Sequence, residues 1–145
     1  MSQPDPDCPF CRIAAGTIPA SKVLESDRVV AFLDIAPVNL GHVLLVPKAH
    51  HANLTELSSS DAALLGGLLP QLTRAILAVT GADGLNLVIN NGQAAGQTVD
   101  HGHWHLIPRF HSDAVRWPWP HLSYPGEAMG QMQDQLVAAL ADVSS

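Results

Sequence analysis

The sequence contains the stretch Asp100-His-Gly-His-Trp-His-Leu-Ile-Pro-Arg109, in which three of the chain's eight histidines alternate with other residues. We expect this stretch to form a β-strand, in which successive side chains point to opposite faces. His101, His103 and His105 would then share one face. Trp104 and its neighbours on the other face would pack against apolar side chains, so the imidazoles must face something else.

Three interpretations of this row of imidazoles are open. It could be a partly exposed polar face of the sheet, although such faces normally carry Lys, Thr and Glu. Two alternate histidines and a third ligand could bind zinc. The imidazoles could also act as a nucleophile and as proton carriers. A row of three imidazoles is costly to bury without hydrogen bonds, so each interpretation must give the rings polar partners.

The loop before the histidines favours the reactive interpretation. It spans Asn90 to Thr98 and carries Gly92 and Gly96, amide side chains and a hydroxyl. Glycines allow backbone N–H groups to approach an anion closely. Alone, such a loop indicates only a connection that needs positive φ angles. Joined to three imidazoles, it predicts a phosphate-reacting site with the phosphate against His103.

Local signals predict the surrounding elements. Apolar and β-branched runs predict strands, and leucines at helical spacing predict one long helix from Ser58 to Thr80. Ser58 is a candidate N-cap, Gly81 is the expected stop, and Pro70 should bend the helix. The expected elements are a short helix near 10–16, strands at 28–35, 42–47, 85–90 and 100–109, the long helix, and a C-terminal helix at about 127–140. This order favours an α+β domain with an antiparallel sheet.

Length and charge limit the function classes. A chain of 145 residues fits one domain. A formal net charge of −6 disfavours binding to nucleic acid but leaves room for a small nucleotide. We find no signal peptide and no stretch approaching the roughly 18 apolar residues of a membrane span, so we expect a cytoplasmic protein. In a reducing compartment, Cys8 and Cys11 predict half of a metal site or free thiols.

Several short motifs together resemble the histidine triad (HIT) family. Gly96 to Arg109 is similar to the family signature, His-x-His-x-His followed by apolar residues. The N-terminal half is similar to the Hint-like and bacterial HIT branches in Cys8-Pro-Phe-Cys11-Arg-Ile, Ile18-Pro19, Phe32-Leu-Asp34-Ile35, Gly41-His42 and Val46-Pro47-Lys48 with His50. The resemblance covers about residues 8–110.

The resemblance implies a single HIT domain over residues 1–145, with a core at about 8–110 and a C-terminal extension at 111–145. The implied fold is α+β, with a five-stranded antiparallel sheet, one long helix and a C-terminal helix. The sheets of two chains would join in a homodimer. The extension bearing Trp117, Trp119 and His121 has no clear counterpart, which leaves the leaving group of any reaction open.

The resemblance also implies a reaction. His103 would attack the α-phosphorus of a purine nucleotide conjugate of AMP type, and water would release the nucleoside monophosphate from a nucleotidyl-histidine intermediate. His101 and His105 would flank the nucleophile and hold the phosphate. His42 matches the fourth active-site histidine of the family.

Binding positions follow by the same resemblance. Asp34 matches the carboxylate that grips the ribose hydroxyls. The positions that contact phosphate and leaving-group oxygens match Asn90, Gly96, Gln97 and Thr98. The apolar slot for the base matches Phe10, Ile13, Phe32 and Ile35, of which the Phe32 and Ile35 side chains could equally be plain core.

Zinc is a separate implication. Cys8, Cys11, His50 and His101 are similar to the four ligands of zinc-containing HIT proteins, a closed set that suits a structural metal. No organic cofactor is expected. His51, His111 and His121 are expected to be solvated. Gly102, where the family usually has a larger side chain, and the bulky Trp104 are departures on the opposite face.

Three functions remain in competition. The first is a nucleotide phosphohydrolase or phosphoramidase, favoured by the N-terminal motifs. The second is a dinucleoside polyphosphate hydrolase, which the Gly-Gln-Thr-Val approach to the triad also resembles. The third belongs to another class and is a non-catalytic purine nucleotide-binding regulatory module.

Overall fold

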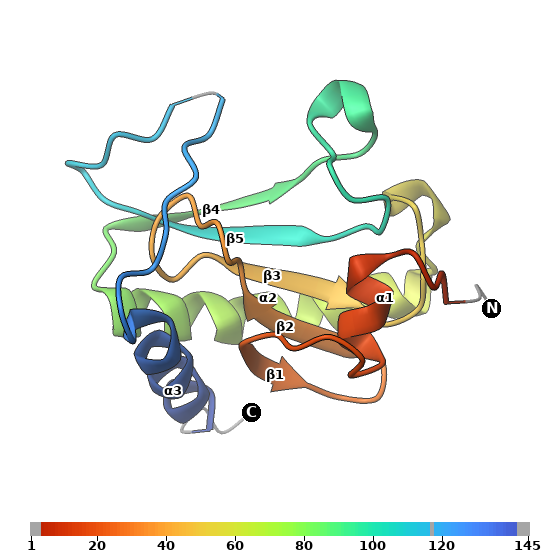
Figure 1. Ribbon diagram of the computed structural model, residues 1–145, viewed down its shortest axis with the longest axis horizontal. Coiled ribbons are helices and arrows are strands. Elements are labelled where there is room, and N and C mark those ends of the chain that lie inside the picture. Colours follow the sequence, from red (N-terminus) through yellow and green to blue (C-terminus); the bar gives the residue numbers. More distant parts are fainter. Residues whose placement is uncertain (1–3, 117, 142–145) are drawn as a thin grey trace.

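The computed structural model describes residues 4–116 and 118–141. One five-stranded antiparallel sheet lies between helices (Figure 1). Its elements are α1 (Pro9–Ala14), β1 (Lys22–Glu25), β2 (Val29–Leu33), β3 (Val43–Pro47), α2 (Ser59–Thr80), β4 (Gly84–Ile89), β5 (Trp104–Arg109) and α3 (Ala128–Ala141), with 3₁₀ turns η1 (Leu54–Glu56) and η2 (Gln93–Ala95). The predicted fold class is thereby confirmed for one chain.

The sheet has the strand order β1-β2-β3-β5-β4. Residues of β2 and β3 are buried throughout, as expected for central strands. Leu44 of β3 pairs with His105 of β5, and Val88 of β4 pairs with the same histidine. In Figure 1, α1 lies in front of the sheet and α2 behind it. His105 therefore has a paired strand on each side.

Alternating side chains of the strands feed two separate apolar clusters. One cluster packs the sheet against α2 and α3 and includes Leu45, Leu106 and Ile76. The other lies under α1 and includes Phe32 and Leu44. The face under α1 is the one on which His103 and His105 line cavities.

Helix α2 has the ends that the sequence predicts. The Ser58 hydroxyl accepts a hydrogen bond from Asp61 N at 3.0 Å, and Gly81 closes the helix in the left-handed region with φ 69°. Pro70 lies inside the helix, as expected.

By length and composition alone, α2 could cross a membrane, because its best 18-residue window has a mean hydropathy of 1.5. The expectation that nothing in the chain resembles a span was therefore too strong. A core helix passes the same test. The face of α2 that bears Leu65, Leu72 and Ile76 is buried against the sheet, which accounts for the apolar composition of that face.

Strand β5 is shorter than the sequence predicts, because it begins at Trp104 rather than at Asp100. Before it, the N–H of Gly102 donates to the carbonyl of His51 at 2.7 Å, and the N–H of His101 donates to Val99 at 2.8 Å. These bonds take the backbone out of the ladder with β3. The predicted start of the strand is therefore wrong, since His101 and His103 precede it. All three imidazoles nevertheless lie on the side of the sheet that carries α1, because the Phe10 ring meets the rings of His101 and His103, and the His103 ring meets that of His105. Trp104 packs against the apolar cluster on the other side, as expected.

Candidate active site

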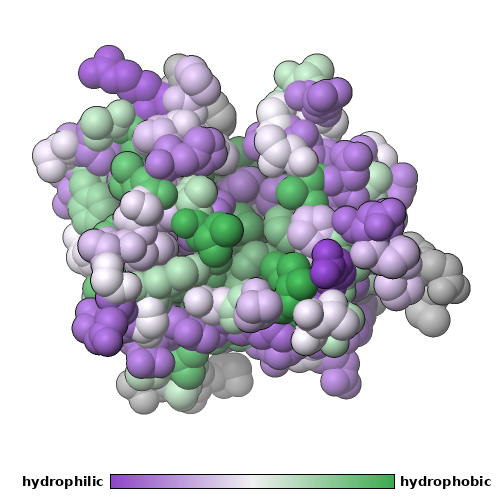
Figure 2. Space-filling view, in the orientation of Figure 1, coloured by the Kyte–Doolittle hydropathy of each residue, from purple (hydrophilic) through white to green (hydrophobic). Residues whose placement is uncertain are grey.

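Two neighbouring cavities open on the sheet face that carries α1. We call them the helix cavity, which lies beside α1, and the tail cavity, which lies beside residues 118–121. Their volumes are about 390 Å³ and 430 Å³. Figure 2 shows this face hollowed between two upper lobes, with apolar surface gathered in the middle.

The helix cavity is predominantly apolar. Its walls include all four side chains predicted for the base slot, Phe10, Ile13, Phe32 and Ile35. Phe10 meets Phe32 edge to face, with ring centroids 5.5 Å apart. Ile35 stands at the rim with 78% of its surface exposed, so it is not plain core, whereas Phe32 both packs in the core and lines the cavity.

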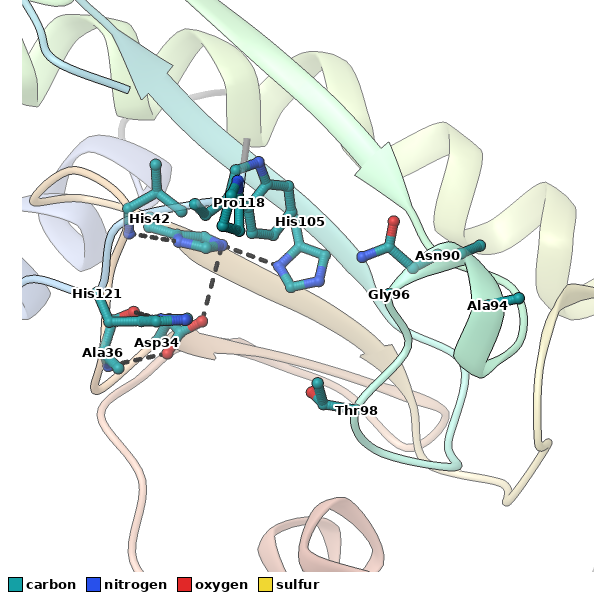
Figure 3. A pocket seen from close by; sticks show the side chains of 13 residues that line it. Asp34, Ala36, His42, Asn90, Ala94, Gly96, Thr98, His105, Pro118 and His121 are labelled. Carbon is teal, nitrogen blue, oxygen red and sulfur yellow. Dashed lines mark hydrogen bonds and ion pairs between the residues drawn. The ribbon is translucent and has the colours of Figure 1, made fainter. Parts of the chain in front are cut away.

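The tail cavity is more polar. His105 lies between a side formed by Asp34, His42 and His121 and a side formed by the loop before β5 (Figure 3). That loop contributes Asn90, Gly96 and Thr98 to the wall. Five residues line both cavities and mark their junction: Asp34, Ala36, Thr98, His105 and His121.

His103 lines the helix cavity and is 5% exposed. Its Nδ1 lies 2.7 Å from the carbonyl oxygen of His101. A carbonyl can only accept, so Nδ1 carries the proton and Nε2 keeps a lone pair. Burial lowers the pKa of His103, which favours the neutral ring. This is the protonation state that a nucleophilic imidazole requires.

A second backbone contact sets the protons of His42 and His105. The N–H of Val38 donates to His42 Nδ1 at 3.1 Å, so the proton of the neutral ring is on Nε2. His42 Nε2 lies 3.0 Å from His105 Nδ1 and donates to it. His105 therefore carries its own proton on Nε2. Burial and the neighbouring imidazoles lower the pKa of each of these histidines to about 3.

Asp34 follows β2 and belongs to both cavities. One carboxylate oxygen accepts from the N–H of Ala36 at 2.9 Å, and the other lies 3.8 Å from His42 Nε2. Burial raises the pKa of Asp34. A carboxylate in this position can accept hydrogen bonds from hydroxyl groups of a bound ligand.

Gln97 does not line either cavity among the described residues. Its amide oxygen accepts from Gly92 N at 2.7 Å, and its amide nitrogen donates to the carbonyls of Ala52 and Val99 at 2.6 and 2.8 Å. The side chain is 5% exposed and is committed to the loop. Its position suits holding the loop in shape, and a direct phosphate contact by Gln97 stays a prediction.

The four predicted metal ligands come together away from the cavities. The ligand atoms of Cys8, Cys11, His50 and His101 all lie within 4.8 Å of one another. Cys8 Sγ is 3.3 Å from His101 Nδ1, and the two imidazole Nδ1 atoms are 3.3 Å apart. A tetrahedral zinc ion with ordinary bond lengths sets its ligand atoms about 3.3–3.8 Å apart, the shortest separation being that of two nitrogens. The set therefore fits zinc.

The surroundings of His101 support this fit. Its Nε2 lies 2.7 Å from the carbonyl oxygen of Pro47, so Nε2 carries the proton and the Nδ1 lone pair faces the thiols. The ring is fully buried and lines neither cavity among the described residues. His101 thus meets the nucleophile through its backbone carbonyl, while its side chain serves the metal cluster.

Other residues have placements that sequence reasoning missed. Trp119 lies against His105 with ring centroids 5.0 Å apart, and His121 is exposed as expected but also lines both cavities. His51 was expected to be solvated and is instead buried, with Nε2 3.6 Å from a carboxylate oxygen of Asp61. His111 is exposed, as expected. The aromatic and Pro-rich composition of the tail was the one signal for Trp119.

Comparison with known proteins identifies the relatives of this chain. The HIT domain profile matches residues 15–112. The adenosine 5'-monophosphoramidase hnt1 of Schizosaccharomyces pombe is 42% identical over 121 residues, which are 81% of this chain and 85% of that protein. Adenylylsulfatase HINT3 of Arabidopsis thaliana is 37% identical over 134 residues, covering 92% of this chain and 68% of that protein. A zinc-bound histidine triad family protein from Mycobacterium smegmatis superposes with a TM-score of 0.83 at 34% identity, covering 93% and 94% of the two chains. The chain therefore belongs to the histidine triad family.

Proposed function

We propose that the protein is a nucleotidyl hydrolase that releases a purine nucleoside 5'-monophosphate of AMP type from a phosphoramidate. The observation that carries the proposal is the 2.7 Å contact between His103 Nδ1 and a backbone carbonyl, which leaves the Nε2 lone pair for attack. The two relatives, named as an adenosine 5'-monophosphoramidase and an adenylylsulfatase, support an adenylyl substrate.

The character of the two cavities supports a position for the substrate. The purine would occupy the apolar helix cavity between Phe10 and Ile35, and the ribose hydroxyls would donate to Asp34. The phosphoryl group would then lie at the junction of the cavities, against His103 and His105. Thr98 also lines the junction and can donate its hydroxyl to a phosphoryl oxygen.

In the first step, His103 Nε2 forms a bond to phosphorus while the P–N bond to the amine breaks. The leaving nitrogen takes a proton from solvent. Because His103 keeps its proton on Nδ1, the nucleotidylated ring is a cation that the carbonyl of His101 stabilises. His105 Nε2–H donates to a phosphoryl oxygen and offsets the charge that develops there.

In the second step, water attacks phosphorus and releases a proton to solvent, while the P–Nε2 bond breaks and returns its electron pair to His103. The positive charge on the ring makes it a good leaving group. His42 maintains the donor at His105 through both steps, because its own Nδ1 accepts from the backbone and its Nε2–H must therefore point at His105.

We propose a structural zinc held by Cys8, Cys11, His50 and His101. When bound, the ion supplies a tetrahedral crosslink and no chemistry at phosphorus. By fixing the ring of His101, it would also fix the backbone carbonyl that orients His103.

We also propose a homodimer joined at the outer edge of β4. This strand pairs with β5 on one side, and the described residues leave its other edge open, with Leu87 50% exposed. Analytical ultracentrifugation should give twice the 15.4 kDa mass of one chain, and Leu87→Lys should weaken the association.

Turnover of an adenosine 5'-phosphoramidate by wild type and by His103→Ala tests the proposed function. We expect AMP release by wild type, a loss of at least a thousandfold in the variant, and AMP affinity that is largely retained. Full turnover by the variant contradicts the assigned nucleophile. Binding of AMP by wild type without turnover of any conjugate favours the regulatory nucleotide-binding module, and faster turnover of a diadenosine polyphosphate favours the polyphosphate hydrolase.

A further inference from the structure

The loop before β5 carries residues of both cavities, and the sheet holds it only at its two ends. Ile89 of β4 and Trp104 of β5 form the last pair of their ladder, so residues 90–103 run outside it. Asn90 at the start of this stretch lines the tail cavity, and the nucleophile His103 at its end lines the helix cavity. The positions of these two side chains therefore depend on contacts from elsewhere in the fold.

A segment that follows β3, residues 51–54, supplies contacts of this kind, and we call it the tie segment. The carbonyl of His51 accepts a hydrogen bond from Gly102 N at 2.7 Å, directly before the nucleophile. The carbonyl of Ala52 accepts from the side-chain amide of Gln97 at 2.6 Å. These two bonds hold the later part of the loop against the tie segment.

A third contact holds the start of the loop. The N–H of Leu54 donates to Oδ1 of Asn91 at 2.8 Å. Asn91 is exposed and lines neither cavity among the described residues. The residue before it, Asn90, lines the tail cavity, and Figure 3 shows its amide directed toward His105. Asn90 is thus held between the last ladder pair on one side and the fastened Asn91 on the other.

We propose that Asn91 is a positioning residue for the proposed reaction, because its bond to the Leu54 N–H holds the Asn90 amide in place beside the phosphoryl group. This inference rests on the proposed function. The Asn90 amide can donate to a phosphoryl oxygen, and donation matters most while charge develops on that oxygen, so a misplaced amide lowers kcat. Asn90 does not line the helix cavity, where the nucleoside would bind, so KM should change little.

Removing the bond from either end tests the proposal. Asn91→Leu keeps the size of the side chain without the acceptor, whereas Asn91→Asp keeps an acceptor oxygen. Leu54→Pro removes the donor instead. Proline fits this position, because Leu54 is the first residue of η1 and Asn53 before it is extended, with φ −158° and ψ −173°. Leu54→Ala measures the loss of the side chain alone. The matched control is Gln93→Leu, which changes an exposed amide of the same loop that lines neither cavity.

With an adenosine 5'-phosphoramidate, we expect Asn91→Leu to lower kcat about three- to tenfold, the range that one hydrogen bond contributes, and to change KM by less than about twofold. Leu54→Pro should show the same loss relative to Leu54→Ala. Combining Asn91→Leu with Leu54→Pro should cause no further loss, because both remove one bond. Asn91→Asp should keep most of the wild-type kcat at about 0.2 M salt, which screens its exposed charge, and Gln93→Leu should keep all of it.

A second comparison separates positioning of Asn90 from a general loosening of the loop. Asn91→Leu is introduced into Asn90→Ala, which has no amide left to misplace. We expect no further fall in kcat in this background. A further fall as large as the one that Asn91→Leu causes in wild type shows that Asn91 does not act through Asn90, and it overturns the inference.

An unchanged kcat in Asn91→Leu, an equal loss in Asn91→Asp, or additive losses from Asn91→Leu and Leu54→Pro also overturn the inference, while AMP release by wild type still supports the proposed function. Absence of AMP release by wild type is the failure of the proposed function itself and removes the basis of the inference. If Asn91→Leu does not fold, as judged by circular dichroism, the comparison of Leu54→Pro with Leu54→Ala decides the matter.

Discussion

Backbone groups determine which ring nitrogen carries the proton in His103 and in His42, and His42 in turn determines it in His105. The carbonyl of His101 requires a proton on Nδ1 of His103, and the N–H of Val38 requires a lone pair on Nδ1 of His42. Both partners are fixed by the fold and do not titrate. His103 is thereby left with a lone pair toward the cavity, and His105 with an N–H donor. The proposed phosphoryl transfer needs both, one for attack on phosphorus and one for donation to a phosphoryl oxygen.

His42→Ala tests this assignment, because the variant removes the hydrogen bond that fixes the tautomer of His105. We expect kcat for the phosphoramidate to fall about tenfold to a hundredfold, at or below the low end of what a positioned proton donor contributes, with little change in KM. Steady-state kinetics beside the exposed control His111→Ala check it. An unchanged kcat in His42→Ala, or an equal loss in the control, refutes the role.

Among the elements, the loop before β5 does the most to shape the site. It begins at Asn90 in the tail cavity, passes Thr98 at the junction, and ends at the nucleophile. Gln97 fastens it from inside through three hydrogen bonds. The loop therefore depends on one buried amide rather than on regular secondary structure.

Replacing that amide tests the dependence. Gln97→Leu leaves the N–H of Gly92 and the carbonyl of Ala52 without these partners, so we expect a loss of about 1–3 kcal/mol of unfolding free energy and a lower kcat/KM. The exposed Gln93→Leu in η2 is the matched control and should change stability by less than about 0.5 kcal/mol. Urea denaturation measures both. Equal midpoints for the two variants would show that the buried amide does not hold the loop.

Periodic elements were predictable from sequence, whereas placements that depend on long-range contacts were not. The ends of α2 follow from Ser58 and Gly81, because caps are local. The start of β5 was misplaced, since the carbonyl of His51 captures the Gly102 N–H from a segment distant in sequence. Burial of His51 and the approach of Trp119 to the site likewise arise from tertiary packing, which no local pattern encodes.

For the molecule as a whole, a zinc ion held by Cys8, Cys11, His50 and His101 would fasten α1 to the rest of the fold. Cys8 and Cys11 come from the N-terminal segment, while His50 follows β3 and His101 precedes β5. These positions are far apart in the chain, so one ion would close long loops and restrict the unfolded state.

We therefore expect one zinc ion per chain by elemental analysis, and a lower melting temperature after removal of the ion with a chelator. Readdition of zinc should restore it. Cys11→Ser should bind less zinc and gain less stability from added zinc than wild type does. Protein that stays free of zinc after supplementation, with unchanged melting, would remove the metal from this account.

The buried imidazoles also predict how stability depends on pH. His42 and His105 have folded-state pKa values near 3, whereas an unfolded histidine titrates near 6.5. Between these values the unfolded chain binds more protons, so stability is complete above about pH 6.5 and is lost as the pH falls toward 3. Urea midpoints should drop across this range, and His42→Gln should show a shallower drop. A flat wild-type profile between pH 7 and 4 contradicts the assignment of neutral buried rings.

The covalent intermediate is the central claim, and mass spectrometry tests it directly. Wild-type protein is mixed briefly with an adenosine 5'-phosphoramidate, quenched in alkali to protect the P–N bond, digested and sequenced. We predict an adenylyl adduct on the peptide containing His103, located on that residue and absent from His103→Ala. An adduct on His105 or on another residue would contradict the account. It would also be contradicted by rapid turnover in which wild type accumulates no adduct at any quench time and solvent oxygen enters AMP in one step with inversion at phosphorus.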